Sequence, residues 1–513
     1  MPKLFSPDTS RLTRPEGTTS QTDAVSARYR HGSPAELVTD MEAIVGADNV
    51  HGRLTDLVRF SSDAGPYRSI PNIVVSPRNA ADLSALMAYC EANDRHMTFR
   101  AAGTSLNGQA MSDDILVDVK THFSGMEVRE GGTKLWSRPG VILGDAQAVL
   151  SRHGFMLGPD PGSTSVCTIG GVLADNSGGM RCSLERDSYH SVEELVFVLP
   201  SGTIVDTTKG DDAFRAQEPE LHADLLAFRD KLRANTDMVE FLRTKFSIRN
   251  TNGLRIDAFL DEDEPVHILK RLLVGSEGIF GAITESVIRT VKLPRVKATT
   301  WVELPNLRDA ANFVHPIMET GAEACELLVA PVMRRSAEHY SHAPESWRTL
   351  DDDAAALLVE VGGSDEAELE QAMERLRTVL ADAPLLRPLE FLTTPEGMRG
   401  AWELRNGLYG LLGADRPNGT AYITEDVCFP PYQVGEAAAD LMDLQAKYGY
   451  PESVMGHAAF GNLHFFFTPR FDREEERESY ANFLDDLAEL VIDKYQGSMK
   501  AEHGTGVNLS LIH

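Results

Sequence analysis

The chain has 513 residues, with 49 Lys and Arg against 77 Asp and Glu, which gives a formal net charge of −28 at pH 7. A surface this acidic repels nucleic acid and anionic membranes, so neither is an expected partner, and an anionic substrate requires a local basic pocket. The length predicts two or three domains, and a hydrophobic fraction of 42% is enough to build packed cores.

The N-terminal segment and the cysteines indicate the compartment. Residues 1–33 are rich in Ser, Thr, Pro and charge and lack the apolar stretch of a secretory signal, so we expect a flexible tail. The five cysteines are scattered and never form a CxxC motif, which argues against disulfides and against iron–sulfur ligation within this chain. No apolar run approaches the roughly 20 residues that span a bilayer. We expect a cytoplasmic protein with no transmembrane segment, and peripheral attachment to the inner membrane is the alternative.

Short strands and amphipathic helices follow the tail. Helical periodicity over 35–46 precedes a β-branched strand at 71–77, and an amphipathic helix follows at 80–93. The next strand, HMTFRAAG at 96–103, runs directly into a glycine-dense loop. This alternation predicts an α+β arrangement.

A second region begins after Pro294. Before it, ELVFVLPSGTIVD at 194–206 predicts a hairpin with a Ser-Gly turn, and the charged, helical segment 209–246 is expected to be an insertion. After Pro294 a fresh strand–helix alternation predicts a second α+β domain. We therefore expect one domain at 34–294, with its core at 71–294, and a C-terminal domain at 295–513.

Three glycine-dense segments, RAAGTSLNGQ, TIGGVLADNSGG and GSEGIFG, are suited to holding a phosphate, because glycine lets backbone N–H groups approach a ligand closely. Taken singly, each could equally be an ordinary glycine turn. Neither GxGxxG nor GxxxxGK[ST] occurs, so a classical dinucleotide fold and a Walker site are not supported. The candidate cofactor-binding residues are Arg100, Gly103, Thr104, Ser105, Asn107, Gly108, Gly170, Gly171, Asn176, Gly178, Gly179, Gly275, Glu277, Gly278 and Gly281.

The order and spacing of these segments resemble the FAD-binding domain of the vanillyl-alcohol-oxidase type, over about residues 71 to 293. The resemblance implies an α+β domain that holds FAD in an extended pose through backbone amides. Because the first loop contains no histidine or cysteine, where some relatives tether the flavin, we expect non-covalent FAD.

A second cluster lies near the end of the chain. GHAAFGNLHF contains His457 and His464, and KAEHGTG contains Glu502 and His503. Two histidines seven residues apart face opposite sides of a continuous strand, but Gly-Asn at 461–462 predicts a break that could bring the imidazoles together. Two histidines and a glutamate can bind Zn²⁺, Mn²⁺ or Fe²⁺, which leaves His503 as a base. For the histidine pair alone, two ordinary histidines are the alternative.

The C-terminal half resembles the substrate domain of FAD-linked D-lactate and D-2-hydroxyacid dehydrogenases, in AWELRNGLYGLLGADR, TEDVCFP, GHAAFGNLHFFF and DKYQGSMKAEHGTG. This resemblance implies a divalent metal, with zinc as the expected ion, and His503 as the base; the implied metal ligands are His457, His464 and Glu502. Arg405 matches the arginine that holds the substrate carboxylate in relatives, and Arg416 is a second candidate. A surface ion pair is the alternative role for either arginine.

The chain also departs from the family pattern. Phe460 stands where relatives usually carry Asp or Glu, so we expect a contact to the histidines to be lost. Val507 replaces an expected arginine and Asn406 a common lysine. The resemblance is to the flavin half of a long form that continues into iron–sulfur clusters, so with the chain ending at His513 we expect a truncated C-terminal domain.

The resulting hypothesis is an FAD-dependent enzyme that oxidises a D-2-hydroxy acid, D-lactate first, to the 2-oxo acid. D-2-hydroxyglutarate and glycolate are alternative substrates. The electron acceptor is expected to be an iron–sulfur protein or a quinone. Two other functions remain open: an impaired paralogue that binds flavin or serves as a scaffold, and a metal-dependent hydrolase whose glycine loops are structural.

Overall fold

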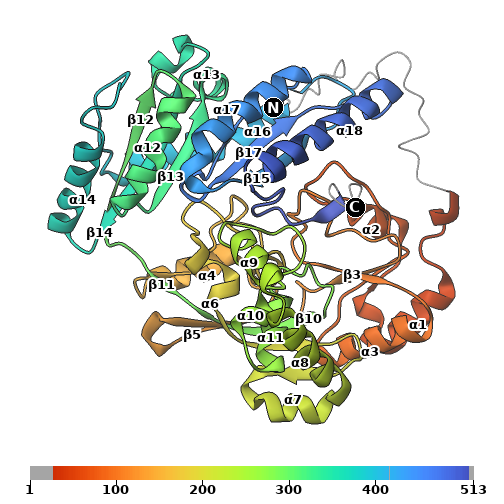
Figure 1. The fold of residues 1–513 in the computed structure, drawn as a ribbon. Helices are drawn as coiled ribbons and strands as arrows, with labels where there is room; N and C mark the ends of the chain where they lie inside the picture. The colour runs from red at the N-terminus through yellow and green to blue at the C-terminus, as the bar shows by residue number, and fades with distance from the viewer. Residues whose placement is uncertain (1–26, 415, 508–513) are drawn as a thin grey trace, which may run out of the picture.

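The computed structural model describes residues 27–414 and 416–507, which form two lobes (Figure 1). The N-terminal lobe holds residues 27–294 and lies below the C-terminal lobe, which holds residues 295–507 apart from 415. The last described residues leave the upper lobe and end against the lower one, where the C-terminal label lies near α2 (Leu54–Arg59). The last described residues therefore connect the two lobes.

The first sheet of the N-terminal lobe has the strand order β1-β2-β4-β3. Its strands are β1 (Val50–His51), β2 (Ile73–Val75), β4 (Ile115–Asp118) and β3 (Met97–Arg100), and the last three run parallel. The sheet packs against α1 (Ala35–Val45) and α3 (Ala80–Ala92) through one apolar core. Parallel strands end at the same edge of a sheet. The loop after β3, which is the first glycine-dense segment, therefore starts at that edge.

The second sheet is antiparallel, with the order β5-β6-β10-β8-β9. Its strands are β5 (Met126–Arg129), β6 (Lys134–Ser137), β10 (Ala282–Arg289), β8 (Val192–Val198) and β9 (Ile204–Asp206). The pairing of β8 with β9 confirms the predicted hairpin. A small third sheet joins β7 (Phe155–Met156) to β11 (Val291–Lys292).

Helices cover the rest of this lobe: α4 (Leu143–Ser151), α5 (Ile169–Asp175), α6 (Ser188–Ser191), α10 (Ala258–Asp261) and α11 (Pro265–Leu273). The predicted helical insertion forms α7 (Asp211–Gln217), α8 (Pro219–Arg233) and α9 (Thr236–Lys245). Residues 1–26 of the predicted tail lie outside the described residues. Tyr29, however, is buried and donates a hydrogen bond to the Ile70 carbonyl (2.7 Å), so the packed part of the chain begins before residue 34.

The C-terminal lobe is built on an antiparallel sheet with the order β12-β14-β13-β16-β17-β15. Its strands are β12 (Val296–Leu304), β14 (Ala355–Gly363), β13 (Ala324–Val329), β16 (Met455–Gly456), β17 (Asn462–Phe467) and β15 (Ile423–Cys428). Its helices are α12 (Leu307–Glu319), α13 (Ala330–His339), α14 (Glu366–Val379), α15 (Pro395–Asn406), α16 (Leu408–Ala414), α17 (Val434–Lys447) and α18 (Glu474–Ala488). One apolar core joins the sheet to these helices. No helix in the described part of the chain has both the length and the apolarity needed to cross a bilayer.

Candidate active site

A cavity of about 670 Å³ lies between the two lobes. The N-terminal lobe lines it with the loop after β3, with α5 and with the start of β10. The C-terminal lobe lines it with side chains of α15, β15, β16 and β17 and with Glu502 and His503. Ligand cavities in proteins typically measure about 300–1,000 Å³, so this one can hold the reacting part of a cofactor together with a small substrate.

The glycine-dense segments form the wall on the side of the N-terminal lobe. The predicted residues that line the cavity are Gly103, Thr104, Ser105, Gly170, Gly171, Glu277, Gly278 and Gly281. Gly103 and Gly278 have φ of +71° and +84°, a backbone conformation that disfavours other residues. Small residues of this kind leave backbone amides accessible, which suits the pyrophosphate of FAD.

The other predicted cofactor residues lie outside the cavity wall: Arg100, Asn107, Gly108, Asn176, Gly178, Gly179 and Gly275. Some of these residues instead make hydrogen bonds within the N-terminal lobe. Arg100 donates to the Ala110 carbonyl (3.1 Å), and Asn176 donates to the Asp187 carboxylate (3.1 Å). The wall also includes residues that were not among the candidate cofactor residues, such as Pro161, Gly162 and Ser163.

The two histidines of GHAAFGNLHF converge because the chain turns between them. β16 ends before His457, a short 3₁₀ turn covers Ala458–Phe460, and Gly461 has φ of +77° before β17 begins. A Cβ at Gly461 would lie 1.9 Å from the Phe429 carbonyl oxygen, so the tight turn requires glycine. The two imidazole rings are 5.0 Å apart and nearly perpendicular, as the predicted break implied.

Glu502 completes the cluster. Its Oε1 lies 3.0 Å from His457 Nε2 and 3.1 Å from His464 Nε2. Its Oε2 is buried without a hydrogen-bond partner among the described residues. Two imidazoles and a carboxylate with potential ligand atoms within 4.8 Å of one another are a donor set that can hold a divalent cation.

The charges in this cluster are coupled. Burial alone would raise the pKa of Glu502, but His457 and His464 hold it well below its ordinary value, so the carboxylate is ionised. Burial alone would lower the pKa of His457, but Glu326 and Glu502 raise it to about 10. Burial lowers the pKa of His464. A metal ion bound by this cluster would therefore replace the proton that His457 carries at neutral pH.

Glu326 is a site residue that the motif reasoning missed. It lies on β13, is fully buried, and its Oε1 is 2.7 Å from His457 Nδ1. Arg405 donates to its other oxygen, also at 2.7 Å. Phe460 carries no acidic group, so the contact that the family pattern has at this position is absent, but Glu326 contacts His457 from another strand. The available signal was an acidic residue inside the apolar strand ACELLV.

The two arginine candidates occupy different environments. Arg405, near the end of α15, lines the cavity and is largely buried. Arg416 is exposed, donates to the Gly413 carbonyl (2.9 Å) and is not part of the cavity wall. Only Arg405 is thus brought to the histidine cluster.

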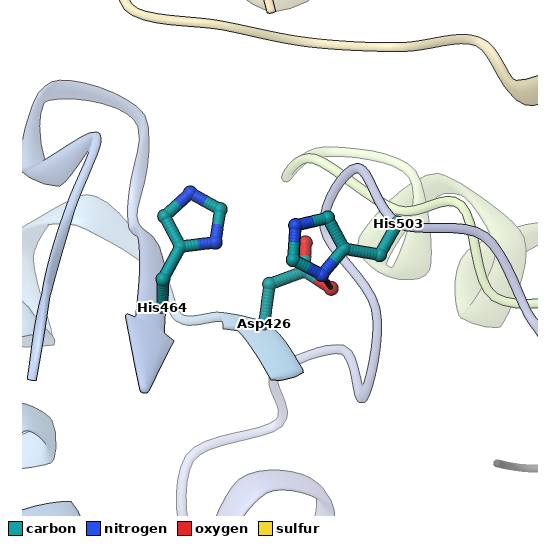
Figure 2. Close-up of side chains that lie close together, drawn as sticks. All are labelled: Asp426, His464 and His503. Atoms are coloured by element: carbon teal, nitrogen blue, oxygen red, sulfur yellow. Dashed lines mark ion pairs between the residues drawn. The ribbon is translucent and has the colours of Figure 1, made fainter. Parts of the chain in front are cut away.

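His503 lies beside the cluster and is paired with Asp426 (Figure 2). Asp426 is opposite His464 in the β15–β17 pairing, and its Oδ1 is 3.3 Å from His503 Nδ1. Its Oδ2 accepts the backbone N–H groups of Ala501 and Glu502. The rings of His503 and His464 are stacked with centroids 5.0 Å apart.

Burial determines the protonation of this pair. It lowers the pKa of His503 well below its ordinary value and raises the pKa of Asp426 to about 7. The imidazole is therefore neutral at neutral pH and can accept a proton. His503 lies beside the predicted metal ligands, as the sequence motifs indicated. Asp426 was not among the predicted site residues.

Sequence comparisons identify both halves of the chain. Residues 71–208 match the FAD binding domain, and residues 293–510 match the C-terminal domain of the FAD linked oxidases. The chain is 26% identical over 466 residues to the glycolate oxidase subunit GlcD of Bacillus subtilis, covering 90% of this chain and 85% of that protein. It is 24% identical to the D-lactate dehydrogenase of Anaerostipes hadrus, covering 85% of this chain and 82% of that protein.

A longer relative matches over part of its length. The D-2-hydroxyglutarate dehydrogenase of Escherichia coli is 26% identical over 486 residues, covering 88% of this chain and 46% of that protein. The chain therefore spans about half the length of the D-2-hydroxyglutarate dehydrogenases that it matches.

Solved structures establish the fold. p-Cresol methylhydroxylase with bound substrate aligns with a TM-score of 0.63 at 13% identity, covering 92% of this chain and 89% of that chain. The 4-ethylphenol oxidase of Gulosibacter chungangensis aligns with a TM-score of 0.63 at 11% identity, covering 94% and 90%. The chain therefore contains an FAD binding domain followed by the C-terminal domain of the FAD linked oxidases, and it has the FAD-binding fold of the vanillyl-alcohol-oxidase type, as the sequence resemblance predicted.

Proposed function

We propose that the protein oxidises a D-2-hydroxy acid, most favourably D-lactate, to the 2-oxo acid. The observation that carries the proposal is that the glycine-rich wall and the histidine cluster line one cavity from opposite lobes. A hydroxy acid in that cavity would contact both. The names of the glycolate and D-lactate relatives support the same class of substrate.

The residues divide the chemistry between them. When bound, FAD supplies the hydride acceptor, and a divalent ion, which we expect to be zinc, supplies Lewis acidity. His457, His464 and Glu502 would hold the ion. The guanidinium of Arg405 would hold the substrate carboxylate.

His503 would act as the general base. Its Nδ1 lies 3.3 Å from Asp426 Oδ1, and Nε2 would take the substrate hydroxyl proton. Because the imidazole is neutral, it can take that proton while the α-hydrogen leaves as hydride. The balance is two electrons and one proton to the flavin and one proton to His503.

The composition of the cavity wall favours a small substrate. Among the described lining residues, Arg405 is the sole Lys or Arg. Thr424 lies two residues from Asp426 and therefore on the same face of β15, where it is paired with Phe466 of β17. Met455 is opposite His464 in the pairing of β16 with β17. These side chains suit the methyl group of lactate and offer no cation for a second carboxylate.

Anaerobic titration of the FAD-loaded protein tests the proposal. D-Lactate should bleach the flavin absorbance, L-lactate should not, and D-2-hydroxyglutarate should require a much higher concentration. Glycolate should bleach the flavin more weakly than D-lactate, because it lacks the methyl group. Flavin that no D-2-hydroxy acid bleaches would favour the scaffold function, and a protein that never binds flavin would contradict the proposal.

A further inference from the structure

We infer that Asn107, Gln109 and Thr251 form a latch that fixes the position of His503 relative to the flavin site. The latch residues belong to the N-terminal lobe, whereas the segment they hold, residues 500–505, belongs to the last part of the C-terminal lobe. They are positioning residues and act through the backbone of this segment. The inference rests on the proposed function of His503 as the base.

Two amides of the flavin-side loop hold the carbonyl groups of the segment. Gln109 Nε2 donates to the His503 carbonyl (2.6 Å). Asn107 Nδ2 lies 3.4 Å from the carbonyl oxygens of both His503 and Gly504, and Asn107 is fully buried. The Asn107 carbonyl in turn accepts the N–H of Val507 (2.7 Å). The loop thus contacts the segment both at His503, the proposed general base, and at Val507.

Thr251 holds the same segment from another part of the N-terminal lobe. Its Oγ1 accepts the N–H of Gly504 (3.1 Å), and its own N–H donates to the Lys500 carbonyl (3.0 Å). Thr251 is buried and is not part of the cavity wall, so its hydroxyl has this contact without touching a ligand.

The glycines of the segment make this close approach possible. A Cβ at Gly504 would lie 2.0 Å from Glu277 Oε1, and one at Gly506 would lie 2.3 Å from the Asn107 Cβ. Both glycines have positive φ, +71° and +54°. The two glycines therefore let the segment pack directly on side chains of the N-terminal lobe.

Both lobes hold the segment over a few residues. Asp426 of the C-terminal lobe holds the N–H of Glu502, whereas the latch holds the carbonyl of His503. The loop that lines the flavin side of the cavity is also the loop that holds the base. The latch thus fixes the backbone of His503 against the flavin side of the cavity, while Asp426 holds the residues just before it.

The substitution Thr251→Val removes the acceptor for Gly504 at nearly constant volume, and Thr251→Ser restores it. Thr300→Val is the matched control, because Thr300 Oγ1 makes one bond to the Glu390 carbonyl (2.9 Å) away from the cavity. We expect Thr251→Val to keep FAD content and KM but to lose about tenfold in kcat, since small displacements of a base are costly. Thr251→Ser should recover most of that loss, and Thr300→Val should behave like the wild type.

Hydrogen exchange gives a readout that does not depend on turnover. In the FAD-loaded protein, the amides of residues 500–507 should exchange faster in Thr251→Val than in the wild type or in Thr300→Val. Gln109→Met, which removes the donor to the His503 carbonyl, provides a second test should Thr251→Val fail to fold.

Different results would contradict the proposed function and the latch. A wild type and a Thr300→Val variant that oxidise no D-2-hydroxy acid would overturn the proposed function, and hydrogen exchange would then decide on the latch. Unchanged exchange and unchanged kcat in Thr251→Val, or a loss confined to KM, would overturn the latch.

Discussion

At the scale of single residues, the site combines ligands that the sequence motifs contain with partners that they do not. His457 is held on one side by Glu326 and on the other by Glu502, and each contact is 3.0 Å or shorter. Glu326 is the outer contact, of the kind that orients a metal-binding imidazole. The histidine pair is therefore arranged before any ion arrives.

The role of His503 makes a direct prediction. In His503→Ala, the rate of flavin bleaching by D-lactate should fall at least about 100-fold, because general-base catalysis contributes that much or more. FAD content should not change. Stopped-flow absorbance measures the rate, and His315→Gln, at an exposed histidine paired with Glu319, is the control. Bleaching at the wild-type rate would rule out this base.

Arg405 and Arg416 make a paired prediction. Replacing Arg405 with Met should raise KM for D-lactate about tenfold or more, because a charge-assisted bidentate contact is lost. Arg416→Met should leave KM close to the wild-type value, because Arg416 is exposed and outside the cavity. Steady-state kinetics of both variants decides which arginine contacts the substrate, and the opposite ranking would exclude Arg405.

At the scale of elements, the turn between β16 and β17 determines whether the histidines meet. Gly461→Ala combines an unfavourable φ with a Cβ contact of 1.9 Å to the Phe429 carbonyl. We expect it to lower the unfolding free energy by about 1–3 kcal/mol and to reduce zinc content. The matched control is Gly449→Ala, whose φ is +69° but whose Cβ would meet nothing within 4 Å. Equal effects of the two substitutions on zinc content would contradict this role for the turn.

A buried ion pair ties β14 to the N-terminal lobe. Arg181 makes two bonds to Glu360, at 2.8 and 2.9 Å, and Lys297 adds a third at 3.0 Å. Burial alone would raise the pKa of Glu360, but Arg181 and Lys297 lower it to about 2. The ionised carboxylate is therefore favoured by folding, and this stability is lost as the pH falls from the ordinary glutamate value of about 4.5 toward 2.

The substitution Glu360→Gln tests the direction of this pKa shift and its effect on stability. At pH 7 the variant should be less stable by about 3 kcal/mol, because a charge of the buried pair is removed. The difference from the wild type should shrink as the pH falls below about 4.5. Thermal unfolding at several pH values measures it, and a difference that grows toward acid pH would contradict the assigned pKa direction.

At the scale of the whole molecule, the sequence predicted the parts that local patterns encode. The glycine-dense segments, the hairpin at 194–206 and the histidine motif all lie where chain order and spacing indicated. The roles of Glu326 and Asp426 could not be assigned this way, because they depend on strand pairing across more than 30 residues. The same holds for Asn107, which the motif assigned to the cofactor and the fold places against the end of the chain.

The two lobes each contribute half of the proposed reaction site. The N-terminal lobe supplies an FAD-binding domain, and the C-terminal lobe supplies the imidazoles and the carboxylate. Both lobes are needed to form the cavity. The central claim is therefore that hydride transfer to the flavin depends on an ion held by the opposite lobe.

Chelation of the FAD-loaded protein tests that dependence most directly. After removal of divalent ions and under anaerobic conditions, the flavin should remain bound but D-lactate should no longer bleach it, and added zinc should restore bleaching. Bleaching by D-lactate that persists at full rate in the metal-free protein would contradict the account.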